Sequence, residues 1–197
     1  MKLVSEQVSQ LEVNVILREL RLALAKNTVG DVVEFGCYVG TTSLFLQCEL
    51  LKSPESVRKL HVYDSFAGLP AKATQDESPA GQQFQAGELT ATKAQLIKHF
   101  QQAHLPLPHI HKGWFNALQT KDVPRQIAFA FLDGDYYHSI LDPLKLIWDH
   151  LEPHAQIVID DYASEQLPGV KKAVDAWAQH HRFHLKVEAS LAIISLE

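Results

Sequence analysis

Residues 32–40 read VVEFGCYVG, an apolar run that closes on two glycines. The run is typical of a short buried strand, and the glycines predict a tight turn that leads into a helix over residues 41–51. A strand, a glycine turn and a helix in this order open many nucleotide-binding α/β domains. This stretch therefore favours an α/β fold built around a parallel sheet.

The alternation of short apolar runs with helical patterns continues along the chain. Further strands are predicted at residues 60–63, around Ile110, and at 127–132, 156–159, 185–187 and 191–196. Short apolar strands separated by helices are typical of a mostly parallel sheet. We expect a Rossmann-like, doubly wound sheet of seven strands with helices on both faces.

The helix after the fourth strand has the clearest period. Its apolar residues at helical spacing are Ile140, Leu144, Ile147 and Leu151. Pro143 lies within this pattern, and we expect it in the first turn, where the missing amide hydrogen has no helical partner.

The N-terminal part is a separate element. Residues 5–26 carry a wide apolar face at helical spacing, and Ser5 is the expected N-cap. We divide the chain into this N-terminal helix, residues 1–28, and one α/β domain, residues 29–197. The width of the apolar face predicts that the helix caps the ligand site or joins a homodimer. The alternative is a helix that packs only on its own domain.

Length and composition fit one globular domain, since 197 residues with 46% hydrophobic and 21% charged residues are close to average. A formal net charge of -5 disfavours a nucleic-acid partner. No apolar run approaches the roughly 20 residues that cross a bilayer, and the N-terminus lacks the apolar core of a signal peptide. We expect a soluble cytoplasmic protein without a membrane partner. Cys37 and Cys48, the only cysteines, favour two free thiols over a disulfide framework.

Four aspartates come directly after two of the predicted buried strands. Asp133 and Asp135 follow one of these strands, and Asp160 and Asp161 follow the next. Carboxylates that converge on one edge of a sheet repel each other and need a cation. Oxygen ligands suit a hard ion, and Mg²⁺ is the usual ion in a site that stays open to substrate oxygens.

The glycine turn indicates the kind of ligand. The spacing of Gly36 and Gly40 differs from the Gly-x-Gly-x-x-Gly turn of dinucleotide enzymes. A carboxylate before the turn, Glu34, suits a ligand with a cationic end better than a pyrophosphate. Asp64 closes the next strand, where an acid can accept hydrogen bonds from the two hydroxyls of a ribose.

Two further features lie near these residues. Residues 68–87 hold two prolines and three glycines without a period, which predicts a long surface loop. Such a loop is either a lid over a ligand or an exposed insertion without a role. The eleven histidines show no His-Glu-x-x-His spacing, and His138 alone lies at the rim of the predicted acidic site.

With these residues in hand, the chain from about Val32 to Ala178 resembles the class I S-adenosylmethionine-dependent methyltransferases. Within them it is similar to the macrocin O-methyltransferase family of metal-dependent sugar O-methyltransferases. The resemblance is carried by VEFG with Gly40, YDSFAGLP (63–70), KGWF (112–115), LDGD (132–135) with Tyr137 and Ser139, IDDY (159–162), and Gly169-Val170 with Ala173-Val174. The family has a longer N-terminal region, and it tends to have Glu at the position of His138. Both differences lie where the resemblance would place the substrate.

The resemblance implies S-adenosylmethionine as cofactor and assigns residues to it. Glu34, Gly36, Gly40 and Thr41 would lie at the methionine end, Asp64 and Ser65 at the ribose, and Gly113 and Trp114 at the adenine.

The resemblance also implies the chemistry at the acidic residues. Asp133, Asp160 and Asp161 would hold Mg²⁺, which would bind two neighbouring hydroxyls of a small-molecule acceptor, a sugar or another vicinal diol. Either Asp133 or Asp135 would accept the proton, with His138 at the rim of the same catalytic set. Two alternatives stay open, a nicotinamide-dependent oxidoreductase and a non-catalytic protein that binds S-adenosylmethionine.

Overall fold

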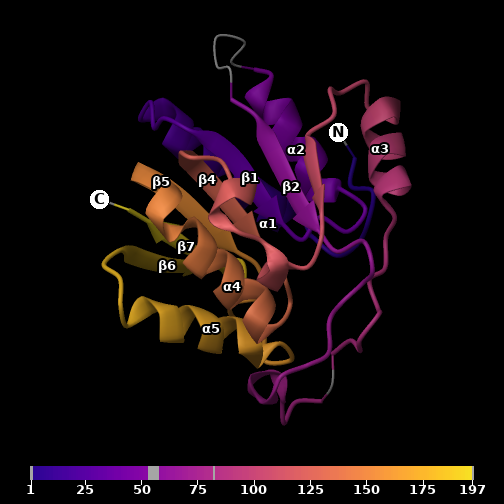
Figure 1. Cartoon of the computed structure of the whole chain (residues 1–197), viewed down its shortest axis with the longest axis vertical. Coiled ribbons are helices and arrows are strands. Elements are labelled where there is room, and N and C mark those ends of the chain that lie inside the picture. The colour runs from indigo at the N-terminus through magenta and orange to yellow at the C-terminus, as the bar shows by residue number, and fades with distance from the viewer. Residues whose placement is uncertain (1, 53–57, 82, 197) are drawn as a thin grey trace.

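The computed structural model describes residues 2–52, 58–81 and 83–196. A seven-stranded sheet in the order β3-β2-β1-β4-β5-β7-β6 runs through it (Figure 1). All neighbouring pairs from β3 to β5 are parallel, whereas β7 is antiparallel to both of its neighbours. The strands are β1 (Asp31–Phe35), β2 (Leu60–Asp64), β3 (His109–Lys112), β4 (Ile127–Leu132), β5 (Leu151–Ile159), β6 (His184–Glu188) and β7 (Leu191–Ser195). The expected mostly parallel, seven-stranded sheet is confirmed.

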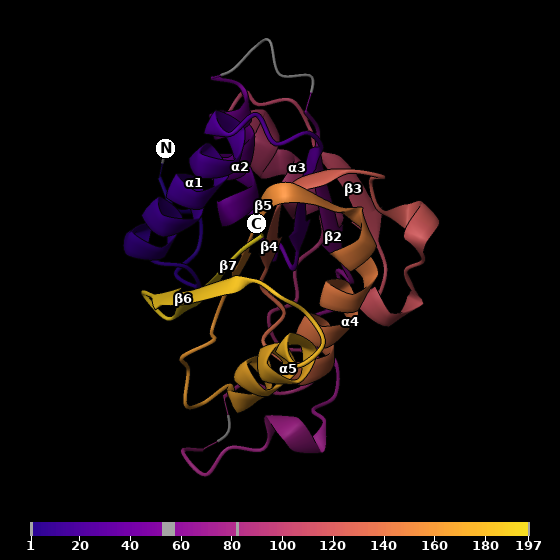
Figure 2. The same ribbon diagram turned by 90° about the vertical axis from the view of Figure 1, so that its left-hand side faces the viewer.

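Helices cover both faces of the sheet, as Figure 2 shows. The helices on one face are α1 (Gln10–Ala25), α2 (Thr41–Leu50) and α3 (Lys93–Gln102), and those on the other are α4 (Tyr137–Ile147) and α5 (Pro168–Ala178). Between β3 and β4 the described chain has only short 3-10 turns, among them η2 (Phe115–Ala117). The sheet is therefore doubly wound, and in the described chain three α-helices cover one face and two cover the other.

Strand β4 shows why the sheet is stable in this form. All six of its residues are buried, as expected for a central strand with helices on both sides. Because side chains alternate along a strand, Ala130 and Leu132 pack with α4 and α5, while Phe129 and Phe131 pack with α1 and α2. Burial of a phenylalanine side chain stabilises the fold by roughly 1.5–3 kcal/mol.

Helix α1 begins later than predicted. Its N-cap is Ser9, whose Oγ accepts a hydrogen bond from the amide of Glu12, while the Glu12 carboxylate accepts from the amide of Ser9. This reciprocal capping box satisfies two amides that the first helical turn leaves unpaired. The prediction of Ser5 as N-cap is therefore wrong. The Ser5 hydroxyl lies 2.8 Å from that of Thr41, so the segment before α1 lies against the start of α2.

Two predictions around α4 are also wrong. Pro143 lies inside the helix and not in its first turn, because α4 already begins at Tyr137. Leu151 does not continue the helical face, since it is the first residue of β5. No residue bounds were predicted for helix α3. Its N-cap Thr92 forms a capping box with Gln95, and Leu96 and Phe100 are its only buried residues, which is a weak apolar pattern.

The structure also bears on the expectations about membrane-spanning helices and about the two cysteines. None of the helices in the described part of the chain is both long and apolar enough to span a membrane. Cys37 is buried and Cys48 is partly buried, and both are free thiols, as predicted.

Candidate active site

A cavity of about 590 Å³ opens at the carboxyl ends of the central strands. This volume is typical of a small-molecule site. Strand ends and the loops that follow them line the cavity, including the turn after β1, the end of β2, the turn after β3 and the loops after β4 and β5. The carboxyl edge of an open parallel sheet is the usual place for a ligand, because its loops are free to vary while the strands stay fixed.

The turn after β1 brings β1 and β4 into backbone contact. Gly36 has a φ of 87°, and a Cβ atom there would overlap the carbonyl oxygen of Asp133. The amide of Asp133 donates to the carbonyl of Phe35 at 2.8 Å, which extends the β1–β4 ladder into the turn. A glycine is therefore required at position 36, both for the positive φ and for the close approach.

Asp64 at the end of β2 holds this turn in place. Its carboxylate accepts hydrogen bonds from the amides of Cys37 at 2.9 Å, Tyr38 at 3.1 Å and Phe66 at 2.7 Å. Three amide donors fix the carboxylate at the cavity wall, where it faces the ligand space beside Ser65. Asp64 therefore stabilises the turn after β1, in addition to the contact with ribose that was predicted for it.

Glu34 does not lie where it was predicted. It is 0% exposed, outside the cavity wall, and its Oε2 accepts a hydrogen bond from the Ser43 hydroxyl of α2. Its other oxygen, Oε1, has no hydrogen-bond partner among the described residues. Burial, and then the nearby charge of Asp64, raises the pKa of Glu34 to about 8. The Glu34 carboxyl group therefore lies outside the cavity and joins β1 to α2 through Ser43.

Gly40 and Thr41 are also outside the cavity wall. Gly40 has a φ of 94° and packs against the Leu96 side chain of α3, and Thr41 is buried beside Ser5. Both residues shape the start of α2, one layer behind the cavity. Other predicted cofactor residues line it directly, namely Gly36, Asp64, Ser65, Gly113 and Trp114.

The adenine side of the predicted site is formed by the turn after β3. The amide of Gly113 donates to the carbonyl of Asp64 at 2.9 Å, so the turns after β2 and β3 are joined. Trp114 follows with 43% of its surface exposed and lines the cavity. A half-exposed indole at a cavity mouth presents a flat apolar face to a ligand ring.

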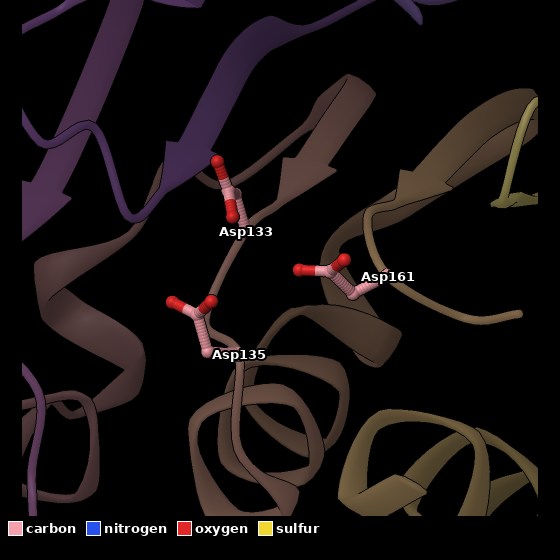
Figure 3. A group of neighbouring side chains, drawn as sticks. All are labelled: Asp133, Asp135 and Asp161. Atoms are coloured by element: carbon pink, nitrogen blue, oxygen red, sulfur yellow. The ribbon is translucent and has the colours of Figure 1, made fainter. Parts of the chain in front are cut away.

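Three aspartates meet at the centre of the carboxyl edge. Asp133, Asp135 and Asp161 each place a carboxylate oxygen within 4.8 Å of the others, and Figure 3 shows the three groups turned toward one another. Asp133 directly follows β4, Asp135 lies in the loop before α4, and Asp161 lies after β5. Asp135 and Asp161 have φ values of 60° and 57°, an unusual conformation that turns their side chains out of the strand direction.

The electrostatics of this trio favour a bound cation. Burial, followed by the neighbouring carboxylates, raises the pKa of Asp133 well above its ordinary value. The same causes raise the pKa of Asp135 to about 7. Burial and then the charge of Glu12 raise the pKa of Asp161 to about 6. Three oxygen donors that repel each other in a buried place fit a hard divalent cation such as Mg²⁺.

The predicted metal set differs from this trio, because it named Asp160 and left out Asp135. Asp160 is buried, its amide donates to the carbonyl of Leu132, and its Oδ1 accepts from the amide of Asp161 at 2.8 Å. It still continues the ladder of β5, so its side chain and that of the next residue point to different sides. Among the described residues, the carboxylate oxygens that lie together are therefore those of Asp133, Asp135 and Asp161, while Asp160 is the buried neighbour of Asp161.

His138 lines the cavity from the first turn of α4. Its Nδ1 lies 3.9 Å from Oδ1 of Asp142, one turn along the same helix, and Asp142 lines the cavity as well. The His138 side chain is 62% exposed, so it stands at the rim, as predicted.

Several lining residues were not predicted. They are polar or aromatic residues in loops, such as Gln7, Tyr38, Asn116, Ser164 and Gln166. Single residues of this kind follow no periodic pattern, so the sequence carries no signal for them. Gln7 is notable because it lies in the segment before α1, which therefore reaches the cavity.

A model of the Macrocin-O-methyltransferase (TylF) family matches residues 12–192 of the chain. The match begins in α1 and ends at the second residue of β7, so it covers β1 to β6, the start of β7 and the helices of both layers.

Two curated relatives are similar in sequence. The 8-demethyl-8-(2,3-dimethoxy-alpha-L-rhamnosyl)-tetracenomycin-C 4'-O-methyltransferase of Streptomyces olivaceus is 30% identical over 146 residues, which are 71% of this chain and 56% of the relative. The Mycinamicin III 3''-O-methyltransferase of Micromonospora griseorubida is 28% identical over 167 residues, 81% of this chain and 64% of the relative. The chain spans less than two thirds of the length of each of these relatives.

A solved structure has the same fold. The structure of the O-methyltransferase NovP agrees with this chain at a TM-score of 0.80 and 21% sequence identity, over 93% of this chain and 78% of the other. The expected class I methyltransferase fold is therefore confirmed.

Proposed function

Because this chain belongs to the macrocin O-methyltransferase family, we propose that it transfers a methyl group from S-adenosylmethionine to a hydroxyl group of a small molecule, with Mg²⁺ as the metal. The observation that carries the proposal is the position of the aspartate trio. Its three carboxylates share one cavity with the glycine turn after β1 and with Asp64. A site for a nucleoside and a site for a cation thus adjoin each other.

The cofactor would lie along the turns after β1, β2 and β3. Asp64 is fixed by three amides and is close to the glycine turn, so its carboxylate can accept hydrogen bonds from the ribose hydroxyls without reorganising. Trp114 would cover the adenine with its exposed face. The backbone of Gly36 would lie beside the methionine part, since no side chain separates it from the cavity.

The metal would be held by Asp133, Asp135 and Asp161. When bound, Mg²⁺ supplies a Lewis acid that lowers the pKa of an acceptor hydroxyl. The trio would orient the acceptor, because its three carboxylates line the same cavity as the glycine turn.

The proton of the hydroxyl would pass to a carboxylate oxygen of Asp133 or Asp135, because both residues line the cavity in which the acceptor would bind. S-adenosylmethionine, when bound, would supply the methyl group, and S-adenosylhomocysteine would be the other product. The residues of the cavity wall would hold cofactor and acceptor so that the acceptor oxygen faces the methyl group.

The charge of the cavity indicates an acceptor without phosphate groups. Among the described residues that line the cavity, none is Lys or Arg, whereas five are Asp: Asp64, Asp133, Asp135, Asp142 and Asp161. Recognition of phosphate relies on arginine, lysine or clustered amide donors. The remaining polar residues of the wall, such as Gln83 and Gln166, suit hydroxyl groups. We propose an uncharged sugar or another vicinal diol.

Isothermal titration with S-adenosylhomocysteine, with NADH as the control ligand, tests the cofactor. Binding of S-adenosylhomocysteine alone is expected, and binding of NADH instead, or of neither, would contradict the proposal. Transfer of a radiolabelled methyl group to a panel of diols, with Mg²⁺ or with EDTA, then tests the reaction. Equal transfer in EDTA would contradict the role of the metal. Cofactor binding with no transfer to any acceptor would favour a non-catalytic protein.

A further inference from the structure

The long loop after β2 is closed at its base and lies against the active site. The amide of Leu69 donates to the carbonyl of Glu88 and the amide of Gly87 donates to the carbonyl of Leu69, both at 2.9 Å. We call residues 69–81 and 83–88 the flap. Leu69, Pro70, Gln83 and Phe84 of the flap line the cavity. In Figure 1 the flap extends beyond the sheet, beside α4 and α5.

One side chain of the flap is buried in the body of the protein. Asp76, the last residue of η1 (Thr74–Asp76), is only 4% exposed. Its Oδ1 accepts a hydrogen bond from the amide of Tyr137 at 2.7 Å, and its Oδ2 accepts from the amide of Ala73 at 2.8 Å. One carboxylate thus joins the flap to the first residue of α4.

The start of α5 is shaped to receive this carboxylate. A Cβ atom on Gly169 would overlap Oδ1 of Asp76, so the glycine leaves the space that the carboxylate fills. Tyr137 is the first residue of α4, and its amide has no partner within the helix. A carboxylate at this position also interacts favourably with the helix dipole.

Two further hydrogen bonds join the flap to the body. Lys172 donates from Nζ to the carbonyl of Gln75, and the Ser78 hydroxyl donates to the carbonyl of Glu165, both at 2.6 Å. Both bonds are solvent-exposed, so water can replace either partner at little cost. Of the three hydrogen bonds, the one between Tyr137 and Asp76 is therefore the most shielded from water, and Leu69 and Phe84 of the flap add apolar contacts with the core.

The attachment point is next to the catalytic segment. Tyr137 lies between Asp135, a member of the trio, and His138 at the rim. Asp135 has a φ of 60°, a left-handed conformation that is uncommon for residues other than glycine. The hydrogen bond from Tyr137 to Asp76 fixes the backbone two residues after this strained position.

We propose that Asp76 is a positioning residue that holds the flap on α4, so that the acceptor side of the cavity and the segment from Asp135 to His138 form one rigid unit. The cofactor side, which is built from the turns after β1, β2 and β3, does not depend on it. The part of this inference that concerns metal and acceptor rests on the proposed function. The part that concerns the flap rests on the geometry alone.

Hydrogen exchange of the full-length protein, followed by mass spectrometry, tests the attachment. In Asp76→Ala we expect the amides of the flap and of the first turn of α4 to exchange roughly 10- to 100-fold faster, as expected for the loss of hydrogen bonds to a buried charged group. Lys172→Ala is the matched control, because it removes an exposed bond to the neighbouring residue of the same turn, and its exchange should stay near that of the wild type. Equal exchange in the two variants would overturn the proposal.

Titrations with Mn²⁺ and with S-adenosylhomocysteine separate a positioning role from a general loss of structure. Asp76→Ala should weaken Mn²⁺ binding about tenfold or more and leave the affinity for S-adenosylhomocysteine within about twofold. Asp76→Asn keeps one acceptor oxygen for the amide of Tyr137, so it should recover part of both properties and also serves if the alanine variant does not fold. Parallel losses for both ligands, or an asparagine variant no better than alanine, would refute a positioning role.

The two proposals fail in different ways. A wild-type protein that binds neither S-adenosylhomocysteine nor Mn²⁺ contradicts the proposed function, while hydrogen exchange still decides whether Asp76 holds the flap.

Discussion

Gly36 and Asp133 meet backbone to backbone at the carboxyl edge of the sheet, where a Cβ atom on Gly36 would overlap the carbonyl oxygen of Asp133. The turn that lines the cofactor side of the cavity and the first aspartate of the trio are therefore one structural unit. A substitution at either residue should therefore displace the backbone of the other, because the amide of Asp133 also donates to the carbonyl of Phe35, the residue before Gly36.

Gly36→Ala should destabilise the protein and displace Asp133. The substitution adds a methyl group where backbone atoms already stand, and it places alanine at a φ of 87°, so we expect a loss of at least about 2 kcal/mol in the free energy of unfolding. Urea denaturation measures this loss. Gly87→Ala is the control, because Gly87 has a similar φ of 84° but open space around it. Equal losses would show that backbone conformation alone, and not the contact, explains the effect.

The pKa of Glu34 predicts a pH dependence of stability. Its pKa in the folded protein, about 8, lies above its ordinary value of 4.5. The folded state therefore holds a proton that the unfolded state releases, so the contribution of this group is fully present below pH 4.5 and is lost as the pH rises through about 8.

Glu34→Gln should remove this part of the pH dependence. The amide resembles the protonated acid, so the variant should lose less stability than the wild type between pH 5 and pH 8.5, with a difference on the order of a few kcal/mol at the upper end. Urea denaturation across this range gives the difference between the two proteins, in which the contributions of the aspartate trio cancel. A difference that stays constant with pH would contradict the assignment.

Asp161→Asn should weaken Mg²⁺ and Mn²⁺ binding at least tenfold, because it removes one charged oxygen from the trio. Asp160→Asn is the control, since Asp160 is the adjacent residue and its Oδ1 accepts a backbone hydrogen bond that asparagine can also accept. Its metal affinity should change less than about threefold. Isothermal titration of both variants decides between the trio seen in the structure and the set predicted from the sequence, because a larger effect at Asp160 would restore the latter.

Asp64→Asn should weaken the binding of S-adenosylhomocysteine at least tenfold. The single carbonyl oxygen of asparagine cannot replace both carboxylate oxygens, which accept from the amides of Cys37, Tyr38 and Phe66. Metal affinity should stay within about twofold of the wild type, because Asp64 is not a member of the trio. Loss of metal binding together with cofactor binding would mean that the two sites are not separate.

Much of the fold could be predicted, because strands such as β4 are continuous apolar runs, and Gly36, Asp133 and Asp160 directly follow β1, β4 and β5. The start of α1 could not be placed correctly, since Ser5 and Ser9 are both good N-caps by residue type. Only the reciprocal bonds of Ser9 with Glu12 distinguish them. The bounds of helix α3 could not be predicted because it buries only Leu96 and Phe100, too few for a clear periodic signal.

The local sequence predicts that aspartates follow β4 and β5, that glycines follow β1, and that these groups meet at one edge of a parallel sheet. Adjacency in the chain is local information, and strand direction then brings the ends together. The fold is needed to show which carboxylates face each other, because Asp133 and Asp135 follow β4 whereas Asp161 follows β5. The fold is also needed to identify Asp76 as the residue that joins the flap to α4, because the sequence around residue 76 does not show that Tyr137 and Gly169 lie against its carboxylate.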